Sequence, residues 1–336
     1  MNFISIFFTV FISILKIFII IILGFFFVRK KIISKSATKD LTNYVINLSL
    51  PCLLFTLLVE ELNKDLFAQS LIFLLGAFII IATGIGLGML VCFLFKIKNP
   101  EKNLISCLCG FGNASYLPIP LIATIIPDSG LFVNASLQFK KAMIYLSFYL
   151  IVWNFLQWSL GKWLIANSSS TKKKFKISFF FNIPTIGIFL GIIVSMLGWK
   201  KIFLDNYFIK KTIFDALKFI GNTTIPIVMF TLGGLLANVN FKNVNFKNIL
   251  LVMSIKLLIF PILGLSFFLW QKDINSLIKF ILFLECIVPP AIALSMISKQ
   301  HETNYEFISS TTLILYLLSI IFIPFWLSCF FKLCWN

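Results

Sequence analysis

Three ionisable side chains lie inside apolar stretches of this chain and are candidates for moving or balancing charge. Glu285 lies one helical turn before Pro289, while Lys16 and Lys256 lie within other apolar stretches. A charge placed within a membrane is costly, and it usually marks an ion pathway or a buried ion pair. Glu285 therefore either exchanges a proton as part of the protein's function or pairs with Lys16 or Lys256, and the sequence leaves both interpretations open.

Two proline-rich segments combine polar side chains with a backbone that cannot stay helical. They are Gly110–Pro120, which contains Asn113, and Glu285–Pro290. Proline lacks a backbone donor and clashes with the preceding turn, so two prolines this close together break a helix. The half-helices after Pro120 and Pro290 then present N–H groups and a positive dipole end, which favour an anion. Asn113 either adds an amide donor to this anion site, or caps a helix, or bonds to a neighbouring helix.

Ten apolar stretches must position these residues. The mean hydropathy is +1.01, and 60% of the residues are apolar while 12% are charged, which no soluble core accommodates. The stretches cover roughly residues 6–28, 42–59, 69–95, 103–126, 143–166, 183–199, 212–237, 248–270, 277–298 and 307–331. The predicted fold class is an all-α polytopic membrane protein of ten transmembrane helices, with breaks in spans 4 and 9.

The net charge of +17 indicates membrane orientation and not nucleic-acid binding, because the lysines gather in short connections between apolar stretches. Five basic residues, from Arg29 to Lys39, follow the first stretch directly, whereas the loop at residues 200–211 argues for the opposite orientation. We expect an integral protein of the plasma or bacterial inner membrane, with both termini on the non-cytoplasmic side.

An internal alignment predicts two related halves. Asn47–Leu57 matches Asn222–Leu232 without a gap, and the asparagine, proline, phenylalanine, threonine and leucine positions coincide. Because each half holds five stretches, an odd number, the second half must enter the membrane inverted. The predicted organisation is a first five-helix repeat at 1–166, a short basic cytoplasmic loop at 167–178 and a second, inverted repeat at 179–336. The matched polar and hinge positions are Asn47, Pro51, Asn222 and Pro226.

An enzyme is not expected. The chain has one histidine, and it lacks the glycine-rich GxxxxGK[ST] motif that cradles phosphates. Its seven cysteines lie in or beside apolar stretches, where they behave as small apolar residues, so we predict no metal and no cofactor. A receptor that binds a ligand without moving it remains an alternative.

The proline-rich segments and the repeated segments described above resemble those of the auxin efflux carrier family, which includes bacterial permeases and plant PIN-type carriers. The resemblance covers nearly the whole chain, through Gly24 and the basic stretch after it, Asn47–Phe55, Gly112–Leu121, Ile225–Gly233 and Ile287–Pro289. Asn113, seven residues before Pro120, resembles the family's substrate-site pattern. The resemblance implies two inverted five-helix repeats, a crossing of broken spans 4 and 9, and a scaffold able to form a homodimer.

The implied function is a secondary active permease of small organic anions, mono- or dicarboxylates such as malate, that works by alternating access around the crossing. Proton or sodium coupling remains open, and a sodium-coupled bile-acid-type anion symporter is the nearest alternative. The residues expected to bind substrate are Asn113, Ser115, Pro118, Pro120, Ile287, Val288, Pro289 and Pro290.

Overall fold

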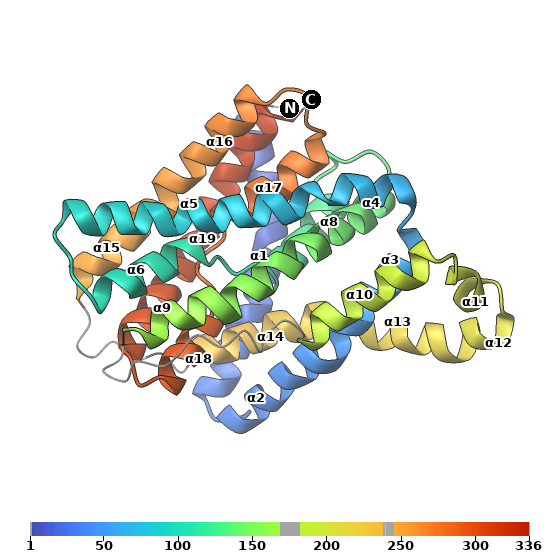
Figure 1. The fold of residues 1–336 in the computed structure, drawn as a ribbon, viewed down its shortest axis with the longest axis horizontal. Helices are drawn as coiled ribbons and strands as arrows, with labels where there is room; N and C mark the ends of the chain where they lie inside the picture. The colour runs from blue at the N-terminus through green and yellow to red at the C-terminus, as the bar shows by residue number, and fades with distance from the viewer. Residues whose placement is uncertain (1, 169–181, 238, 240–244, 336) are drawn as a thin grey trace.

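The computed structural model describes residues 2–168, 182–237, 239 and 245–335, and all regular elements in these ranges are helical (Figure 1). Seven helical runs in them are long and apolar enough to cross a membrane: Phe3–Arg29, Lys35–Glu61, Lys64–Leu94, Ala135–Ala166, Tyr207–Leu236, Phe246–Trp270 and Tyr305–Leu333. The predicted polytopic α-helical membrane protein is confirmed. Of the predicted loop at 167–178, residues 169–178 lie outside the described ranges.

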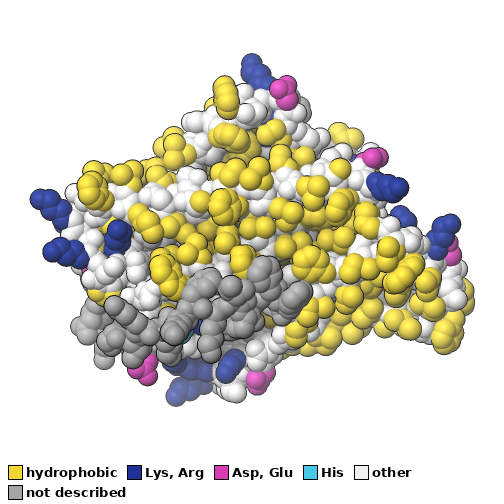
Figure 2. All heavy atoms as spheres, viewed as in Figure 1, with side chains coloured by type: hydrophobic (Ala, Val, Ile, Leu, Met, Phe, Trp, Pro, Cys, Tyr) yellow, Lys and Arg dark blue, Asp and Glu magenta, His cyan; other side chains and the backbone are white. Residues whose placement is uncertain are grey.

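The surface agrees with a bilayer environment. Figure 2 shows hydrophobic side chains spread over the visible face, with the charged side chains gathered towards its edges. Exposed large apolar residues such as Phe8, Phe78 and Leu90 belong to the spanning helices. In water such a surface would be a large exposed apolar patch, which soluble monomers rarely have. In a bilayer, the lipid tails contact these apolar side chains without a loss of free energy.

The first span packs closely against two later helices. The first span is α1 (Phe3–Arg29), and the two later helices are α14 (Thr224–Leu236) and α19 (Tyr305–Leu333). A Cβ on Gly24 would lie 2.0 Å from the Phe230 carbonyl oxygen, so α1 and α14 meet backbone to backbone. The rings of Phe3 and Phe325 lie 6.2 Å apart. This contact brings the start of α1 to the end of α19, and both chain termini lie at the same end of the molecule (Figure 1).

A second group of helices forms around the second span. It consists of α2 (Lys35–Tyr44), the π-helical turn η1 (Val45–Ser49), α3 (Leu50–Glu61), α10 (Ile183–Met196), α11 (Lys200–Leu204), α12 (Tyr207–Ile209), the π-helical turn η3 (Lys210–Phe214) and α13 (Asp215–Asn222). A Cβ on Gly187 would lie 2.9 Å from the Pro51 carbonyl oxygen, and one on Gly191 would lie 2.8 Å from the Leu58 side chain. Gly187 and Gly191, one helical turn apart, therefore let α10 pack closely against α3.

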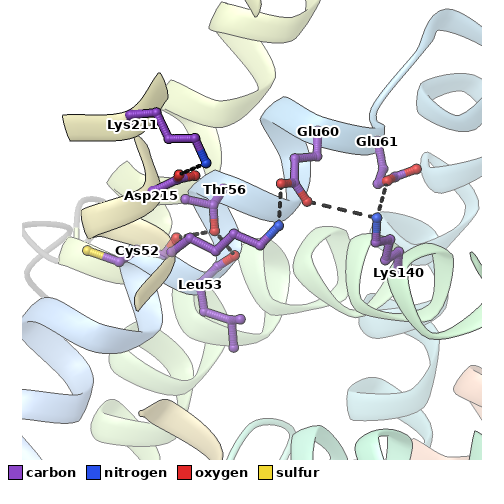
Figure 3. A network of polar contacts seen from close by, with 9 residues as sticks. Cys52, Leu53, Thr56, Glu60, Glu61, Lys140, Lys211 and Asp215 are labelled. Carbon is purple, nitrogen blue, oxygen red and sulfur yellow. Dashed lines mark hydrogen bonds and ion pairs between the residues drawn. The ribbon is translucent and has the colours of Figure 1, made fainter. Parts of the chain in front are cut away.

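Ion pairs tie this group to a third set of helices. The third set contains α4 (Lys64–Ser70), α5 (Ile72–Leu94), α6 (Glu101–Gly110), α8 (Ala135–Leu156), the π-helical turn η2 (Gln157–Gly161) and α9 (Lys162–Ala166). Lys140 Nζ of α8 lies 2.6 Å from the Glu61 carboxylate and 3.9 Å from that of Glu60. Glu60 is also 2.5 Å from Lys218 Nζ of α13, so the network in Figure 3 joins α3, α8 and α13.

The two proline-rich segments interrupt their spans as predicted. The predicted fourth span consists of α6 followed by α7 (Pro118–Asp128), and the predicted ninth consists of α17 (Ser276–Ile287) followed by α18 (Ala293–Gln300). Helix α7 begins at Pro118 and not after Pro120, because proline is well suited to the first helical positions, where no N–H partner is needed. The remaining helices are α15 (Phe246–Ser254), the π-helical turn η4 (Ile255–Ile259) and α16 (Phe260–Trp270).

The two interruptions pair with each other. The Asn113 N–H donates to the Pro289 carbonyl at 2.8 Å, and the Ala291 N–H donates to the Phe111 carbonyl at 2.9 Å. These bonds form an isolated antiparallel bridge between Gly112 and Pro290. Backbone groups freed by the breaks need partners inside a membrane, and each interruption supplies one acceptor to the other.

Candidate functional site

A cavity of about 280 Å³ opens beside the paired interruptions. Its wall combines the two interruptions with α8, η2, η1 and the starts of α3 and α10, and among the described residues that form it none carries a charge. The wall is formed by Ile46, Leu50, Asn113, Ser115, Tyr116, Leu150, Trp153, Asn154, Gln157, Trp158, Asn182, Pro184, Ala291, Ile292 and Ala293. The lining is thus mostly aromatic, aliphatic and carboxamide, as expected of a small-molecule site.

Asn113 stabilises the first interruption through two hydrogen bonds of its side chain. Its Oδ1 accepts a hydrogen bond from the Tyr116 N–H at 3.0 Å, and its Nδ2 donates to the Tyr316 hydroxyl oxygen of α19. The interhelical bond is therefore present, whereas the bond to the Tyr116 N–H lies in the turn before α7 and does not cap that helix, which begins at Pro118. Nδ2 carries two hydrogens, and the bond to Tyr316 uses one of them.

The N-terminus of α18 offers backbone donors to the cavity. Ile292 and Ala293 line it, and among the described residues no acceptor bonds to either of their N–H groups. Helix α7 is poorer in donors, because Pro118 and Pro120 in its first turn have no N–H. The predicted attraction of an anion to a half-helix N-terminus therefore applies better to α18 than to α7.

The other residues expected to bind substrate divide into two groups. Ser115 lines the cavity beside Asn113. Six are buried in the packing around the interruptions and do not belong to the wall: Pro118, Pro120, Ile287, Val288, Pro289 and Pro290. These six pack around the paired interruptions, which are called the crossing from here on. Their side chains do not line the cavity.

Glu285 and Lys256 lie beside the crossing, next to Gly112. A Cβ on Gly112 would lie 3.5 Å from both Lys256 Nζ and the Glu285 backbone oxygen. Both side chains are 1% exposed, and in the described part of the chain neither Lys256 Nζ nor the Glu285 carboxylate has a hydrogen-bond partner. Lys256 Nζ lies 5.2 Å from the centre of the Phe260 ring, a cation–π distance. Two ionisable groups of opposite sign are thus buried beside Gly112 without a direct bond to each other.

Lys16 does not pair with Glu285. Its Nζ lies 2.6 Å from the Asp128 carboxylate at the end of α7, and both side chains are partly exposed. The interpretation of Lys16 as a partner of Glu285 is wrong, because the fold brings the middle of α1 to the far end of α7 and away from the crossing.

The matched positions of the second and seventh apolar stretches are not among the residues that line the cavity. Asn47, Asn222 and Pro226 are exposed, whereas Pro51 is buried against α10. The two spans contact each other nearby through the hydroxyls of Tyr44 and Thr223, which lie 2.9 Å apart. A hinge role for the matched positions stays a prediction.

Several cavity residues were not anticipated from the sequence. Asn154 and Gln157 stand three residues apart inside an apolar stretch, and polar side chains in mid-span are a usable signal for a functional site. Trp153 donates its indole N–H to the Gly112 carbonyl at 3.0 Å and so braces the first interruption from α8. Tyr316 gave no comparable signal, since its role depends on α19 packing against Asn113.

Comparison with known proteins places this architecture in a family. A family model described as "Membrane transport protein" matches residues 9–176 and 168–327. PIN-LIKES 7 of Arabidopsis thaliana is 21% identical, with 95% of this chain and 96% of that protein aligned. An uncharacterized transporter of Methanothermobacter thermautotrophicus is 22% identical, with 94% and 96% aligned. PIN-LIKES 5 of Arabidopsis thaliana is 22% identical over 91% of this chain and 92% of that protein.

The family match extends over nearly the whole of the chain, including both interruptions and the helices that wall the cavity. The relatives align with this chain from end to end and not through one shared segment. The chain therefore belongs to the membrane transport protein family that includes the auxin efflux carriers, and it is an integral membrane transporter.

Proposed function

We propose that this protein is a secondary active carrier of small organic anions, mono- or dicarboxylates such as malate, and that the anion binds in the cavity beside the crossing. The observation that carries this proposal is the pair of unbonded N–H groups of Ile292 and Ala293 at the N-terminus of α18. Together with the helix dipole, these donors favour a carboxylate without requiring a cationic side chain.

The architecture in this proposal has ten spans in two inverted repeats. Helix α10 and the two interrupted spans add three to the seven long helical runs. The gap-free match of Asn47–Leu57 with Asn222–Leu232 and the equivalent places of the interruptions support a first repeat at 1–166 and a second at 179–336. Alternating access then moves the crossing relative to the remaining helices.

Glu285 and Lys256 are the candidates for coupling in this mechanism. They are buried beside Gly112 and have no direct bond to each other, so a change in the charge of either one alters the electrostatic energy of the crossing strongly. Proton coupling through Glu285 is the first version of this proposal, and sodium coupling is the second. The two are distinguished by whether a pH gradient or a sodium gradient drives accumulation of the anion.

Uptake into liposomes tests the proposal. Purified protein is reconstituted, and uptake of radiolabelled mono- and dicarboxylates is followed with a proton gradient, a sodium gradient or neither. The variant Asn113→Asp keeps the acceptor for the Tyr116 N–H but adds a negative charge to the wall. At a separation of about 4 Å and an effective dielectric constant of about 20, this charge repels the anion by roughly 4 kcal/mol.

We expect wild-type protein to accumulate at least one carboxylate and Asn113→Asp to lose at least tenfold of that uptake. The matched control is Asn43→Asp, which makes the same change at an exposed position of α2 and should transport normally. If wild-type protein moves no carboxylate, the proposed function is wrong. If Asn113→Asp transports as well as Asn43→Asp, the cavity is not the anion site.

A further inference from the structure

Gln157 presents an unused hydrogen-bond acceptor in the cavity wall. Its side chain is 1% exposed and lines the cavity. Within the described part of the chain, no donor bonds to its Oε1. A buried carboxamide oxygen without a partner costs free energy that a native protein normally avoids, so a group that enters the cavity is the natural candidate to supply the donor.

The backbone at Gln157 is also unusual. Gln157 is the first residue of η2, where the ordinary helix of α8 widens into a π-helical turn. Such turns are rare and occur frequently at functional sites. This one lies next to the first interruption, because Trp153, one turn earlier, bonds to the Gly112 carbonyl.

Two other carboxamide oxygens of the wall are occupied. Asn113 Oδ1 accepts the Tyr116 N–H. Asn182 Oδ1 accepts both the N–H of Thr185, at 2.9 Å, and its hydroxyl, at 2.6 Å. Gln157 Oε1 differs from them because it is enclosed and unpaired, so the wall provides an acceptor in addition to the anion-favouring donors of α18.

We propose that Gln157 is a specificity-determining residue, and that its amide oxygen accepts a hydrogen bond from a hydroxyl group of the transported carboxylate. The inference rests on the proposed function and deepens it: the preferred substrates are hydroxycarboxylates. The carboxylate lies at the N-terminus of α18 and the hydroxyl at Gln157. A carboxylate without a donor leaves Oε1 buried and unpaired, and a site built around a hydrogen bond rejects such an analogue.

Matched ligand pairs test this inference. Lactate and propionate differ in one hydroxyl, and so do malate and succinate. Binding of all four is measured on purified full-length protein by competition or by ligand-induced thermal stabilisation. The variants are Gln157→Met, which keeps the length of the side chain but removes the acceptor, and Gln138→Met, the same change on α8 outside the cavity.

In wild type and Gln138→Met we expect the hydroxylated member of at least one pair to bind about tenfold more tightly than its partner. In Gln157→Met the ratio should fall to about one, chiefly because the hydroxylated member weakens. The ratio within a pair separates this role from a structural one, since a general defect weakens both members equally.

Two results would overturn the inference and leave the carrier proposal standing. In the first, wild-type protein binds carboxylates but does not discriminate within either pair, a measurement that needs no variant to fold. In the second, Gln157→Met retains the wild-type ratio. Failure of all four ligands to bind would instead reject the proposed anion site, and the inference with it.

Discussion

The hydrogen bond between Asn113 and Tyr316 should stabilise the crossing by a measurable amount. It joins the first interruption to α19, and both residues are buried. The informative perturbation is a double-mutant cycle composed of Asn113→Ala, Tyr316→Phe and the two changes together. Tyr316→Phe removes only the hydroxyl, whereas Asn113→Ala also removes the acceptor of the Tyr116 N–H.

The magnitudes follow from the groups left unpaired. Each buried polar group that loses its partner costs about 1–3 kcal/mol. Asn113→Ala affects two such groups, the Tyr116 N–H and the Tyr316 hydroxyl, so the free energy of unfolding should fall by about 2–6 kcal/mol. Tyr316→Phe strands only the Asn113 amide and should cost about 1–3 kcal/mol. The double variant should cost less than the sum of the two by about 1–2 kcal/mol.

The assay is reversible unfolding of the purified protein in mixed micelles, with the free energy of unfolding compared across the four proteins. Costs that add to within about 0.3 kcal/mol would show that the two side chains do not interact. That result would refute the role assigned to Asn113 as the residue that holds the first interruption against α19.

Three further perturbations probe other contacts. Gly233→Ala should destabilise the protein by roughly 3 kcal/mol or prevent folding, because its Cβ would lie 1.8 Å from a backbone oxygen of α1. The control is Gly86→Ala, whose Cβ would have nothing within 4 Å and which should be neutral or slightly stabilising. Thermal unfolding of the two variants measures the difference. Lys256→Met and Glu285→Gln each remove one of two buried ionisable groups of opposite sign that share no direct bond. In a double-mutant cycle, their effects on the free energy of unfolding should be non-additive by about 0.5–3 kcal/mol, and effects that add to within about 0.3 kcal/mol would contradict a coupling between them. Lys140→Met should lower the free energy of unfolding by about 1 kcal/mol, because Lys140 forms partly solvated ion pairs with Glu60 and Glu61. The difference in stability between wild type and variant should shrink at high salt. A difference that does not change with salt would contradict an electrostatic cause.

The broken spans could be predicted from the sequence because the chemistry of proline is local. Pro118 with Pro120, and Pro289 with Pro290, prevent a continuous helix whatever surrounds them. The apolar stretches likewise located the seven helical runs in the described part of the chain that are long and apolar enough to cross a membrane. Helix ends were less predictable: α8 begins at Ala135, eight residues before the expected 143, because it extends through polar residues beyond the apolar stretch.

The cavity was harder to predict because it depends on contacts between distant residues. The sequence located Asn113 and Ser115, but Asn154 and Gln157 acquire their place only when α8 packs against the interruptions. Lys16 shows the same limit, since its partner Asp128 is 112 residues away. The π-helical turns, including the one that begins at Gln157, have no clear mark in the local sequence.

The most direct test of the account is whether a transported carboxylate occupies the cavity beside the crossing. The reaction of Ser115→Cys with a soluble maleimide is timed with and without a saturating concentration of that anion. Asn43→Cys on the exposed face of α2 serves as the control, and the parent protein gives the background of its seven cysteines. The account predicts that the anion slows labelling of Ser115→Cys several-fold and leaves Asn43→Cys unchanged. Equal labelling of Ser115→Cys with and without the anion would contradict it.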